Sequence, residues 1–581
     1  MTRNVATISR LLSAAGLVCG LQLAHAPPLH AASMAPVAAE NGMVVTAHHL
    51  ASKVGVDILK RGGNAIDAAV AVGYALAVVY PAAGNLGGGG FMTIQFADGK
   101  KTFLDFREKA PLAARADMFL DANGNVIRAL STRGHLSVAV PGTVSGLEVA
   151  REKYGTMKRE SLVAPAIRLA EKGFVQDAGD IDTYRSVVDD LAKDPESAAI
   201  FLNNGVAFLP GQRLIQKDLA ATLRHISQRG TAGFYKGPVA RAIAASSASG
   251  KGIITLEDLA QYRTREMAPV ECDYRGYRIV SAPPPSSGGV IVCEILNILE
   301  GYPLKEMGFR SAQAVHVQIE AMRHAYVDRN NYLGDPDFVS NPIARLLDKG
   351  YAEKIRAAIH PAKAGVSQAI MPGTPPHEGL NTTHYSIVDK DGNAVAVTYT
   401  LNSWFGARVT AAGTGVLLNN EMDDFTVKRG VPNSFGLVQG EANAIAPGKR
   451  PLSSMSPTIV TRDGKPVLVV GSPGGSYIIT AVVHAILNVV DYGMDIQEAV
   501  DAPRFHQQWL PEATTAEDFA LSPDTEKMLT GMGHKLVAQG PRTHLTAILV
   551  GAPSLGGKPV GRNRLYGAND LRRNTGLAFG Y

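Results

Sequence analysis

A strong excess of one charge is missing from this chain of 581 residues, in which 57 Lys and Arg stand against 52 Asp and Glu. The net charge of +5 is small for this length. It gives no indication of nucleic-acid binding, which needs basic residues concentrated on one face. Sequence repeats of about 20–50 residues are also missing, which argues against a solenoid or a propeller.

Long apolar runs are missing as well. The most hydrophobic internal run, residues 65–83, is interrupted by Asp67 and ended by Pro81. It is too short for a membrane span and predicts a helix buried on nearly all sides. A shorter apolar run, residues 11–23, follows two arginines and precedes small residues. This pattern predicts a cleavable signal peptide over residues 1–32 and a periplasmic or secreted protein that is not anchored in a membrane.

Common cofactor and nucleophile motifs are missing too. Ser472 lacks the upstream glycine of a G-x-S-x-G elbow, and Asn443 occupies the first glycine position of a phosphate loop. The glycine-rich stretch at 84–91 does not fit G-x-G-x-x-G, and the fifteen histidines show no spacing such as H-E-x-x-H. We therefore expect neither a cofactor nor a metal.

Cysteine is scarce, with only three residues. Cys19 lies in the predicted signal peptide, so Cys272 and Cys293 remain in the exported chain. An oxidising compartment permits a disulfide between them. Two separate buried thiols are the alternative, and sequence alone does not decide between them.

Strand and helix patterns occur in both halves of the chain. Apolar residues make up 46% and charged residues 19%, which is typical of a well-buried globular protein. Hairpins are predicted around residues 97–100, 389–393 and 463–464. Because the strands of neither half suffice for a covered sheet, we expect one layered α+β body instead of two independent domains.

The stretch GLNTTHYS (379–386) joins a loose Pro- and Gly-rich segment to a clean strand pattern. If residues 389–393 close the hairpin, its ladder places Thr382 opposite Thr400. A cut after Asn381 would give Thr382 both a hydroxyl and a free α-amine. Such an amine has a pKa of about 7.7–8.0 and can act as the base for its own hydroxyl. The alternative is ordinary turn and strand chemistry, or an Asn-Thr-Thr glycosylation acceptor.

Longer segments of the chain resemble the γ-glutamyltransferase family, the glutathione hydrolases among the N-terminal-nucleophile hydrolases. The resemblance extends from about residue 40 to the C-terminus, with the motifs in family-like order. The segments that carry it are GGNAIDAAVAVGYALAVVYPAAGNLGGGGF (62–91), DFREKAP (105–111), DYRGYRIVSAPPPSSGG (273–289), YLGDPDF (332–338), NTTHYSIVDKDGNAVAVTYTLNSWFG (381–406), LLNNEMDDF (417–425), RPLSSMSPT (450–458) and GSPGGS (471–476).

The resemblance implies an α+β fold, a four-layer αββα sandwich built from both subunits of a cleaved precursor. Cleavage between Asn381 and Thr382 would give a large subunit (33–381) and a small subunit (382–581) that remain associated as a heterodimer. Thr382 matches the family's nucleophile, and Thr400 matches the threonine that hydrogen-bonds to it.

The implied substrates are glutathione and other γ-glutamyl compounds. Their γ-glutamyl group would be held on the nucleophile as an ester and passed to water or to an acceptor amino acid or dipeptide. Residues that match the family's substrate contacts and oxyanion hole are Arg107, Ser453 and Ser454 for the α-carboxylate, Asn402, Glu421 and Asp424 for the α-ammonium, and Gly474 and Gly475 for the oxyanion.

Each of these residues also has a simpler interpretation. Arg107 and Glu108 could form a surface ion pair, and residues 421–424 could form a solvated acidic turn. Ser453 and Ser454 could be turn residues. Phe435 also departs from the family, because many bacterial relatives carry Tyr there, and the hydroxyl that could join a lid is missing.

Two other functions stay open at this stage. An acylase of the same family would act on glutaryl-β-lactams, which lack the α-ammonium. A periplasmic protein that binds γ-glutamyl compounds would need no cleavage. Cleavage separates the enzymes from the binding protein, because the amine base exists only after the cut.

Overall fold

Two seven-stranded antiparallel sheets form the centre of the body between Pro36 and Tyr581. The structure is a computed structural model that describes residues 33–367 and 382–581. The predicted signal peptide (1–32) and Asn381 lie outside the described residues. Among the described helices, none combines the length and apolar character that a membrane span requires.

The first sheet has the order β21-β2-β10-β11-β3-β4-β7. Three of its seven strands come from the segment after residue 381 and four from the segment before it. In sheet order the strands are Leu577–Gly580, Met43–Thr46, Thr382–Val388, Ala394–Thr400, Gly89–Gln95, Lys101–Phe106 and Arg265–Met267.

The second sheet has the order β1-β20-β19-β15-β14-β9-β8 and mixes the two segments in the same way. In sheet order its strands are Val37–Ala39, Leu565–Asn569, Thr546–Val550, Lys465–Gly471, Thr458–Arg462, Tyr277–Ser281 and Val270–Tyr274. Short pairings lie outside both sheets: β5 (Phe174–Val175) with β6 (Arg213–Leu214), β12 (Thr410–Ala411) with β13 (Val416–Leu417), and β16 (Phe505–His506) with β17 (Thr514–Ala516) and β18 (Leu536–Ala538).

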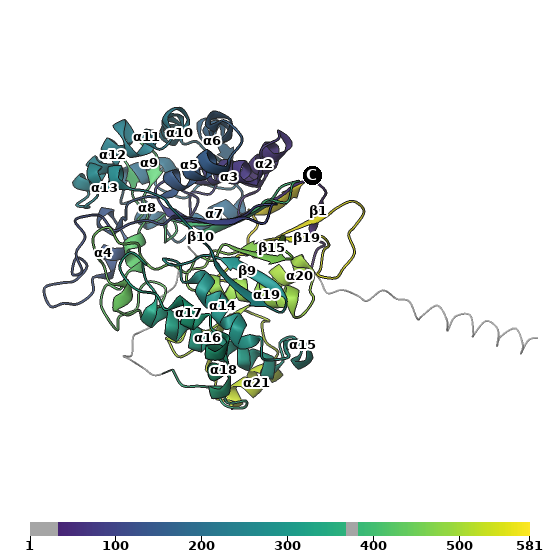
Figure 1. Cartoon of the computed structure of the whole chain (residues 1–581). Coiled ribbons are helices and arrows are strands. Elements are labelled where there is room, and N and C mark those ends of the chain that lie inside the picture. Colours follow the sequence, from purple (N-terminus) through teal and green to yellow (C-terminus); the bar gives the residue numbers. More distant parts are fainter. Residues whose placement is uncertain (1–32, 368–381) are drawn as a thin grey trace, which may run out of the picture. The chain divides into compact units, whose positions relative to one another are not determined.

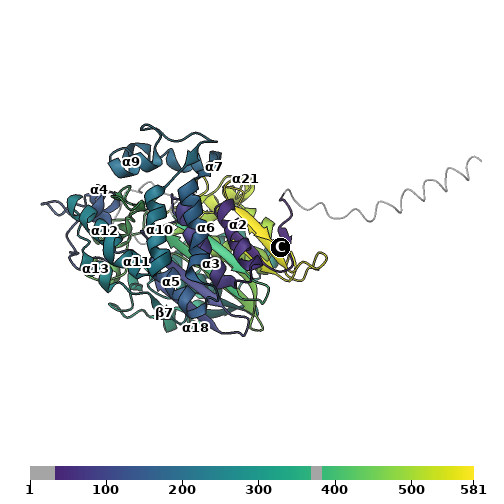
Figure 2. The ribbon, with the colours of Figure 1, turned by 90° about the horizontal axis from the view of Figure 1, so that it is seen from above.

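Helices cover the outer face of each sheet (Figures 1 and 2). On the first sheet lie α2 (His49–Lys60), α3 (Ala65–Val79) and α5 (Thr143–Tyr154), while α6 (Arg159–Lys172) packs on α3 and α10 (Lys217–Arg229) packs on α6. On the second sheet lie α14 (Gly288–Leu299), α19 (Tyr477–Val490) and α20 (Ile496–Asp501), while α16 (Ala312–Tyr332) and α18 (Lys349–Ala358) pack on α14. A third apolar cluster joins the facing sides of the two sheets and contains residues of both, such as Val45, Ala396 and Ile548. The predicted αββα sandwich is therefore confirmed.

The helix predicted at residues 65–83 is buried along its whole length. Asp67, which interrupts the apolar run, closes a capping box with Asn64 at the start of α3. Its carboxylate also accepts hydrogen bonds from the backbone N–H groups of Thr156 and Met157. The Asp67 carboxylate therefore has hydrogen-bond partners, which is the condition for burying a carboxylate.

The predicted hairpin register is confirmed, because Thr382 pairs with Thr400 and Val388 with Ala394. Asp389 closes the turn, and its Oδ1 accepts hydrogen bonds from the backbone N–H groups of Asp391 and Asn393. This local turn chemistry fixes which residues face one another in β10 and β11.

Cys272 on β8 and Cys293 on α14 form a disulfide. The sequence left this pairing open, because the two residues lie on different elements whose packing is a tertiary feature.

Candidate active site

A pocket lies at the beginning of β10, where Thr382 starts the strand. It brings together residues from both segments of the chain. Among the described residues that the sequence predicted for the site, all line it except Gly474, which is next to the lining residue Gly475. The lining residues are Arg107, Arg329, Thr382, Thr400, Asn402, Glu421, Asp424, Phe435, Leu437, Leu452, Ser453, Ser454, Met455, Gly475, Ser476 and Ile478.

Thr382 is placed by the hairpin. Its Oγ1 lies 3.3 Å from Oγ1 of Thr400, and both side chains are buried. The backbone N–H of Asn402 donates to the Thr400 hydroxyl at 2.8 Å and holds it in position. Asn402 itself adopts a φ of +71°, a left-handed conformation that asparagine tolerates better than most residues. Its Nδ2 donates to the carbonyl of Asn420, so its Oδ1 is the atom suited to an ammonium.

The charged residues of the pocket bind one another. The Arg107 guanidinium donates to Glu421 through Nη1 and to Asp424 through Nη2, the second at 2.5 Å. Nη1 also lies 3.4 Å from Glu108, and Nε donates to the carbonyl of Pro451 at 3.2 Å. Arg107, Glu108 and Glu421 have side chains no more than 1% exposed. The surface-pair and solvated-turn interpretations are therefore wrong.

Burial controls the protonation of this cluster. It raises the pKa of Glu108 to about 7 and the pKa of Glu421 well above its ordinary value, although Arg107 opposes both shifts. Burial also raises the pKa of Asp424. For Arg107 burial acts in the other direction, but the charges of Glu421, Glu108 and Asp424 outweigh it and raise the pKa. Three carboxyl groups thus compete for one guanidinium in a site that disfavours net charge.

The two serines are held by neighbours that the sequence did not predict. Ser287 donates to the carbonyl of Ser453 through both its backbone N–H and its hydroxyl. Arg329 on α16 donates from Nη2 to the Ser454 hydroxyl at 2.9 Å and from Nε to the Ser287 hydroxyl at 2.9 Å. The turn interpretation of the serines is wrong, because Ser453 forms an isolated β-bridge with Ser286 and neither serine lies in a turn.

Arg329 is the main site residue missed by the sequence reasoning. Its side chain is buried, and within the described residues no carboxylate forms an ion pair with it. Its other hydrogen bonds go to Asn330 and Gln439. Burial lowers its pKa to about 10, so it stays protonated at neutral pH. In the sequence, the only indication that Arg329 belongs to the site was its position three residues before the YLGDPDF segment.

Gly474 and Gly475 end the loop that faces Thr382. Their φ angles are +132° and +56°, conformations that favour glycine. A Cβ on Gly475 would lie 2.3 Å from the Phe435 ring, so the ring leaves no room for a side chain at position 475. Within residues 33–367 and 382–581, neither amide N–H donates to another protein atom.

A sequence profile of the gamma-glutamyltranspeptidase family matches residues 51–580. The chain is 71% identical over 576 residues to the glutathione hydrolase proenzyme of Pseudomonas sp. (strain A14), a match that covers 99% of each chain. It is 49% identical over 588 residues to the glutathione hydrolase proenzyme of Escherichia coli (strain K12), again over 99% of each. Among solved structures, it is similar to the cephalosporin acylase from Bacillus halodurans, with a TM-score of 0.82 and 28% identity over 96% of this chain and 98% of that one.

Proposed function

Because the chain belongs to the gamma-glutamyltranspeptidase family and is a glutathione hydrolase, we propose that Thr382 becomes its N-terminal nucleophile after a cut at the 381–382 bond. The observation that carries the proposal is the position of Thr382. It begins β10, contacts Thr400, and opens into a pocket that holds both signs of charge. The same hydroxyl would make the cut by attacking the carbonyl of Asn381 and giving an ester that water opens.

In the mature enzyme the Thr382 hydroxyl attacks the γ-carbonyl carbon of the substrate, and its proton passes to the α-amine. The amides of Gly474 and Gly475 are suited to stabilise the oxyanion that forms. When the C–N bond breaks, the amine returns the proton to the leaving group. Water or an acceptor amine, such as that of an amino acid or a dipeptide, then attacks the ester and regenerates the hydroxyl.

Substrate binding is an exchange of ionic partners. The α-carboxylate of a γ-glutamyl group takes Arg107, whose planar fork suits a carboxylate, and accepts hydrogen bonds from Ser453 and Ser454. The α-ammonium binds Asn402, Glu421 and Asp424. The two carboxylates are the partners that Arg107 releases. One positive and one negative charge enter together, so the buried site does not change its net charge.

A glutaryl-β-lactam acylase is the weaker alternative. A glutaryl group has a carboxylate but no ammonium, so it would displace the carboxylates from Arg107 and leave them without a cation. The identity of 71% to the glutathione hydrolase proenzyme of Pseudomonas sp. (strain A14) exceeds the identity of 40% to an acylase proenzyme of Pseudomonas sp. (strain V22), which agrees with this argument.

Mass determination of the purified protein tests the proposal. We expect two tightly associated chains, the smaller beginning with Thr382, and a larger one from which residues 1–32 have been removed during export. A single uncut chain that still binds γ-glutamyl compounds would favour the binding-protein alternative instead.

Thr400→Ala is expected to slow both the cut and the turnover, because the hydrogen bond at 3.3 Å supports the same hydroxyl in both reactions. Losing one such bond costs about 1 kcal/mol, or roughly fivefold in each rate. Rates of cleavage and of γ-glutamyl anilide hydrolysis, measured on separate samples, check this. Unchanged values for both would mean that Thr400 does not support Thr382.

Arg329→Gln is expected to raise KM for a γ-glutamyl anilide about tenfold and to change kcat much less. The reason is that Arg329 donates to the Ser454 hydroxyl and so directs the hydroxyl proton toward the substrate carboxylate. Combining it with Ser454→Ala should add little, because both changes remove the same contact. Full additivity of the two effects on KM would show that Arg329 acts independently of Ser454.

A further inference from the structure

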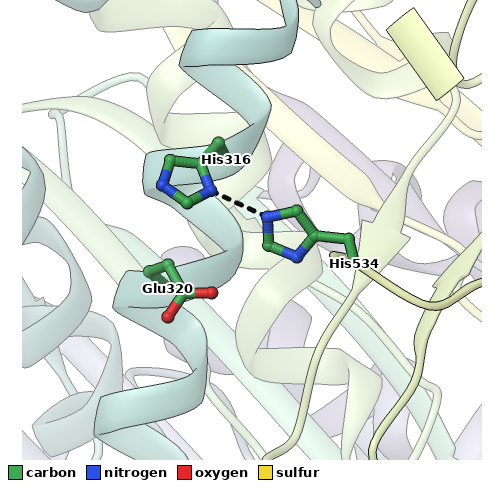
Figure 3. A group of neighbouring side chains, drawn as sticks. All are labelled: His316, Glu320 and His534. Atoms are coloured by element: carbon green, nitrogen blue, oxygen red, sulfur yellow. Dashed lines mark hydrogen bonds between the residues drawn. The ribbon is translucent and has the colours of Figure 1, made fainter. Parts of the chain in front are cut away.

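A second group of polar side chains lies on α16 and on the segment that follows α21 (Pro523–Gly531) (Figure 3). His316 and Glu320 are one helical turn apart, and His534 comes from the other segment of the chain. One ligand atom from each side chain lies within 4.8 Å of the others. All three side chains are at most 3% exposed, and none of them lines the catalytic pocket.

The ring of His316 is already oriented as a metal ligand. Its Nε2 lies 2.8 Å from the carbonyl of His360, so this nitrogen carries the proton and Nδ1 presents a lone pair toward His534. The Glu320 Oε1 accepts a hydrogen bond from the backbone N–H of Gly365 at 3.2 Å. Backbone partners of this kind orient histidine and carboxylate ligands in metalloproteins.

The local charge also favours a cation. Glu320 and Glu512 both bind the guanidinium of Arg323, and these three side chains together carry one negative charge. Two imidazoles and a carboxylate are the ligand types that zinc combines in three-ligand sites. Harder ions such as Mg²⁺ prefer sites made of oxygen alone.

We propose that His316, Glu320 and His534 bind one divalent transition-metal ion of the zinc type. As the structure stands, Nδ1 of His316 and Nε2 of His534 share a hydrogen bond of 2.7 Å. Two nitrogens bound to one tetrahedral zinc lie about 3.3 Å apart, so a small separation of the rings admits the ion. His534 then carries its proton on Nδ1, which within the described residues has no hydrogen-bond partner. The tautomer changes and no net proton is released.

The site would join the two subunits. His316 and Glu320 precede the proposed cut and His534 follows it, so the ion would bridge large and small subunit. The ligand partners His360 and Gly365 also lie in the stretch that leads to the proposed cut, where Ala364 donates to the carbonyl of Met532. Only this bridging role rests on the proposed cleavage, since metal binding itself needs no cut. The sequence did not predict a metal because His316 and His534 are 218 residues apart.

Metal analysis of the purified full-length protein tests the proposal. After chelator treatment and gel filtration, we expect the protein to take up one equivalent of Zn²⁺, and Co²⁺ to give the visible absorption of a tetrahedral site. His534→Gln and Glu320→Gln should each weaken Zn²⁺ binding at least tenfold. His360→Ala is the matched control, because it removes a neighbouring imidazole but keeps the carbonyl that binds His316, and its affinity should be unchanged.

The melting temperature gives a second readout that does not depend on activity. Zn²⁺ should raise it in the unmodified protein and in an uncut Thr382→Ala chain, but not in His534→Gln. Binding in the uncut chain separates failure of this proposal from failure of the proposed cleavage. If the unmodified protein takes up no stoichiometric Zn²⁺, or if His534→Gln binds it equally well, the three residues are only a buried hydrogen-bonded group and the proposal is overturned.

Discussion

A Thr382→Ala chain is expected to remain one polypeptide across the 381–382 bond and to lose hydrolysis of γ-glutamyl anilides by on the order of a million-fold. Losses of that size follow the removal of a nucleophile in other covalent hydrolases. The reason is that the same oxygen makes the cut and attacks the substrate. Thr382→Ser keeps a hydroxyl and should still be cut, though more slowly. Electrophoresis and mass determination measure the cut, and a single-turnover assay measures the chemistry.

Thr383→Ala is the matched control for this experiment. Thr383 is also buried, and within the described residues its Oγ1 has no hydrogen-bond partner, so removing that oxygen costs little. This variant should be cut and should remain active. Efficient cleavage of the Thr382→Ala chain at the same bond would falsify the autocatalytic account.

Glutaryl donors are expected to react 10- to 150-fold more slowly than matched γ-glutamyl donors, in terms of kcat/KM. When either donor places its carboxylate on Arg107, Glu421 and Asp424 lose their guanidinium partner. Only the γ-glutamyl donor gives these two carboxylates a new cationic partner, its α-ammonium. A charged hydrogen bond contributes about 1.5–3 kcal/mol, which corresponds to roughly this factor.

Asp424→Asn should narrow that difference, mainly by weakening the γ-glutamyl donor. The amide keeps the shape of the carboxylate but removes its charge, so the ammonium loses an ionic partner while the glutaryl donor loses nothing. Measuring kcat/KM for both anilides with both proteins gives four values. Equal kcat/KM values for the two donors in the unmodified enzyme would contradict the assignment of the ammonium site and favour the acylase alternative.

Local patterns predicted the parts of the fold that local chemistry determines. The β10–β11 register followed from the turn at Asp389, and the burial of α3 followed from the apolar run at residues 65–83. The C-terminal strand β21 was not predicted, because it is only four residues long, only Ala578 among them is buried, and the strand takes its conformation from pairing with β2. Its strand conformation is a property of the sheet and not of its own sequence.

The sequence predicted which residues form the site, but not which of them contact one another. The resemblance indicated Arg107 and Glu421 as ligands for opposite ends of the substrate, yet the structure shows them bound to each other across 314 residues of sequence. No pattern in either segment contains that pairing. Arg329 was missed for a similar reason, since its contact with Ser454 spans 125 residues.

Both sheets combine strands from before and after residue 381, and β10 lies between β2 and β11 near the middle of the first sheet. Before the proposed cut, the chain folds as one molecule, and its folding rate does not depend on protein concentration. Afterwards neither fragment has a complete sheet, so refolding becomes a bimolecular reaction between two pieces that each expose unpaired strand edges. After maturation, unfolding would thus be irreversible at low protein concentration. The lifetime of the enzyme would then be set by its unfolding rate.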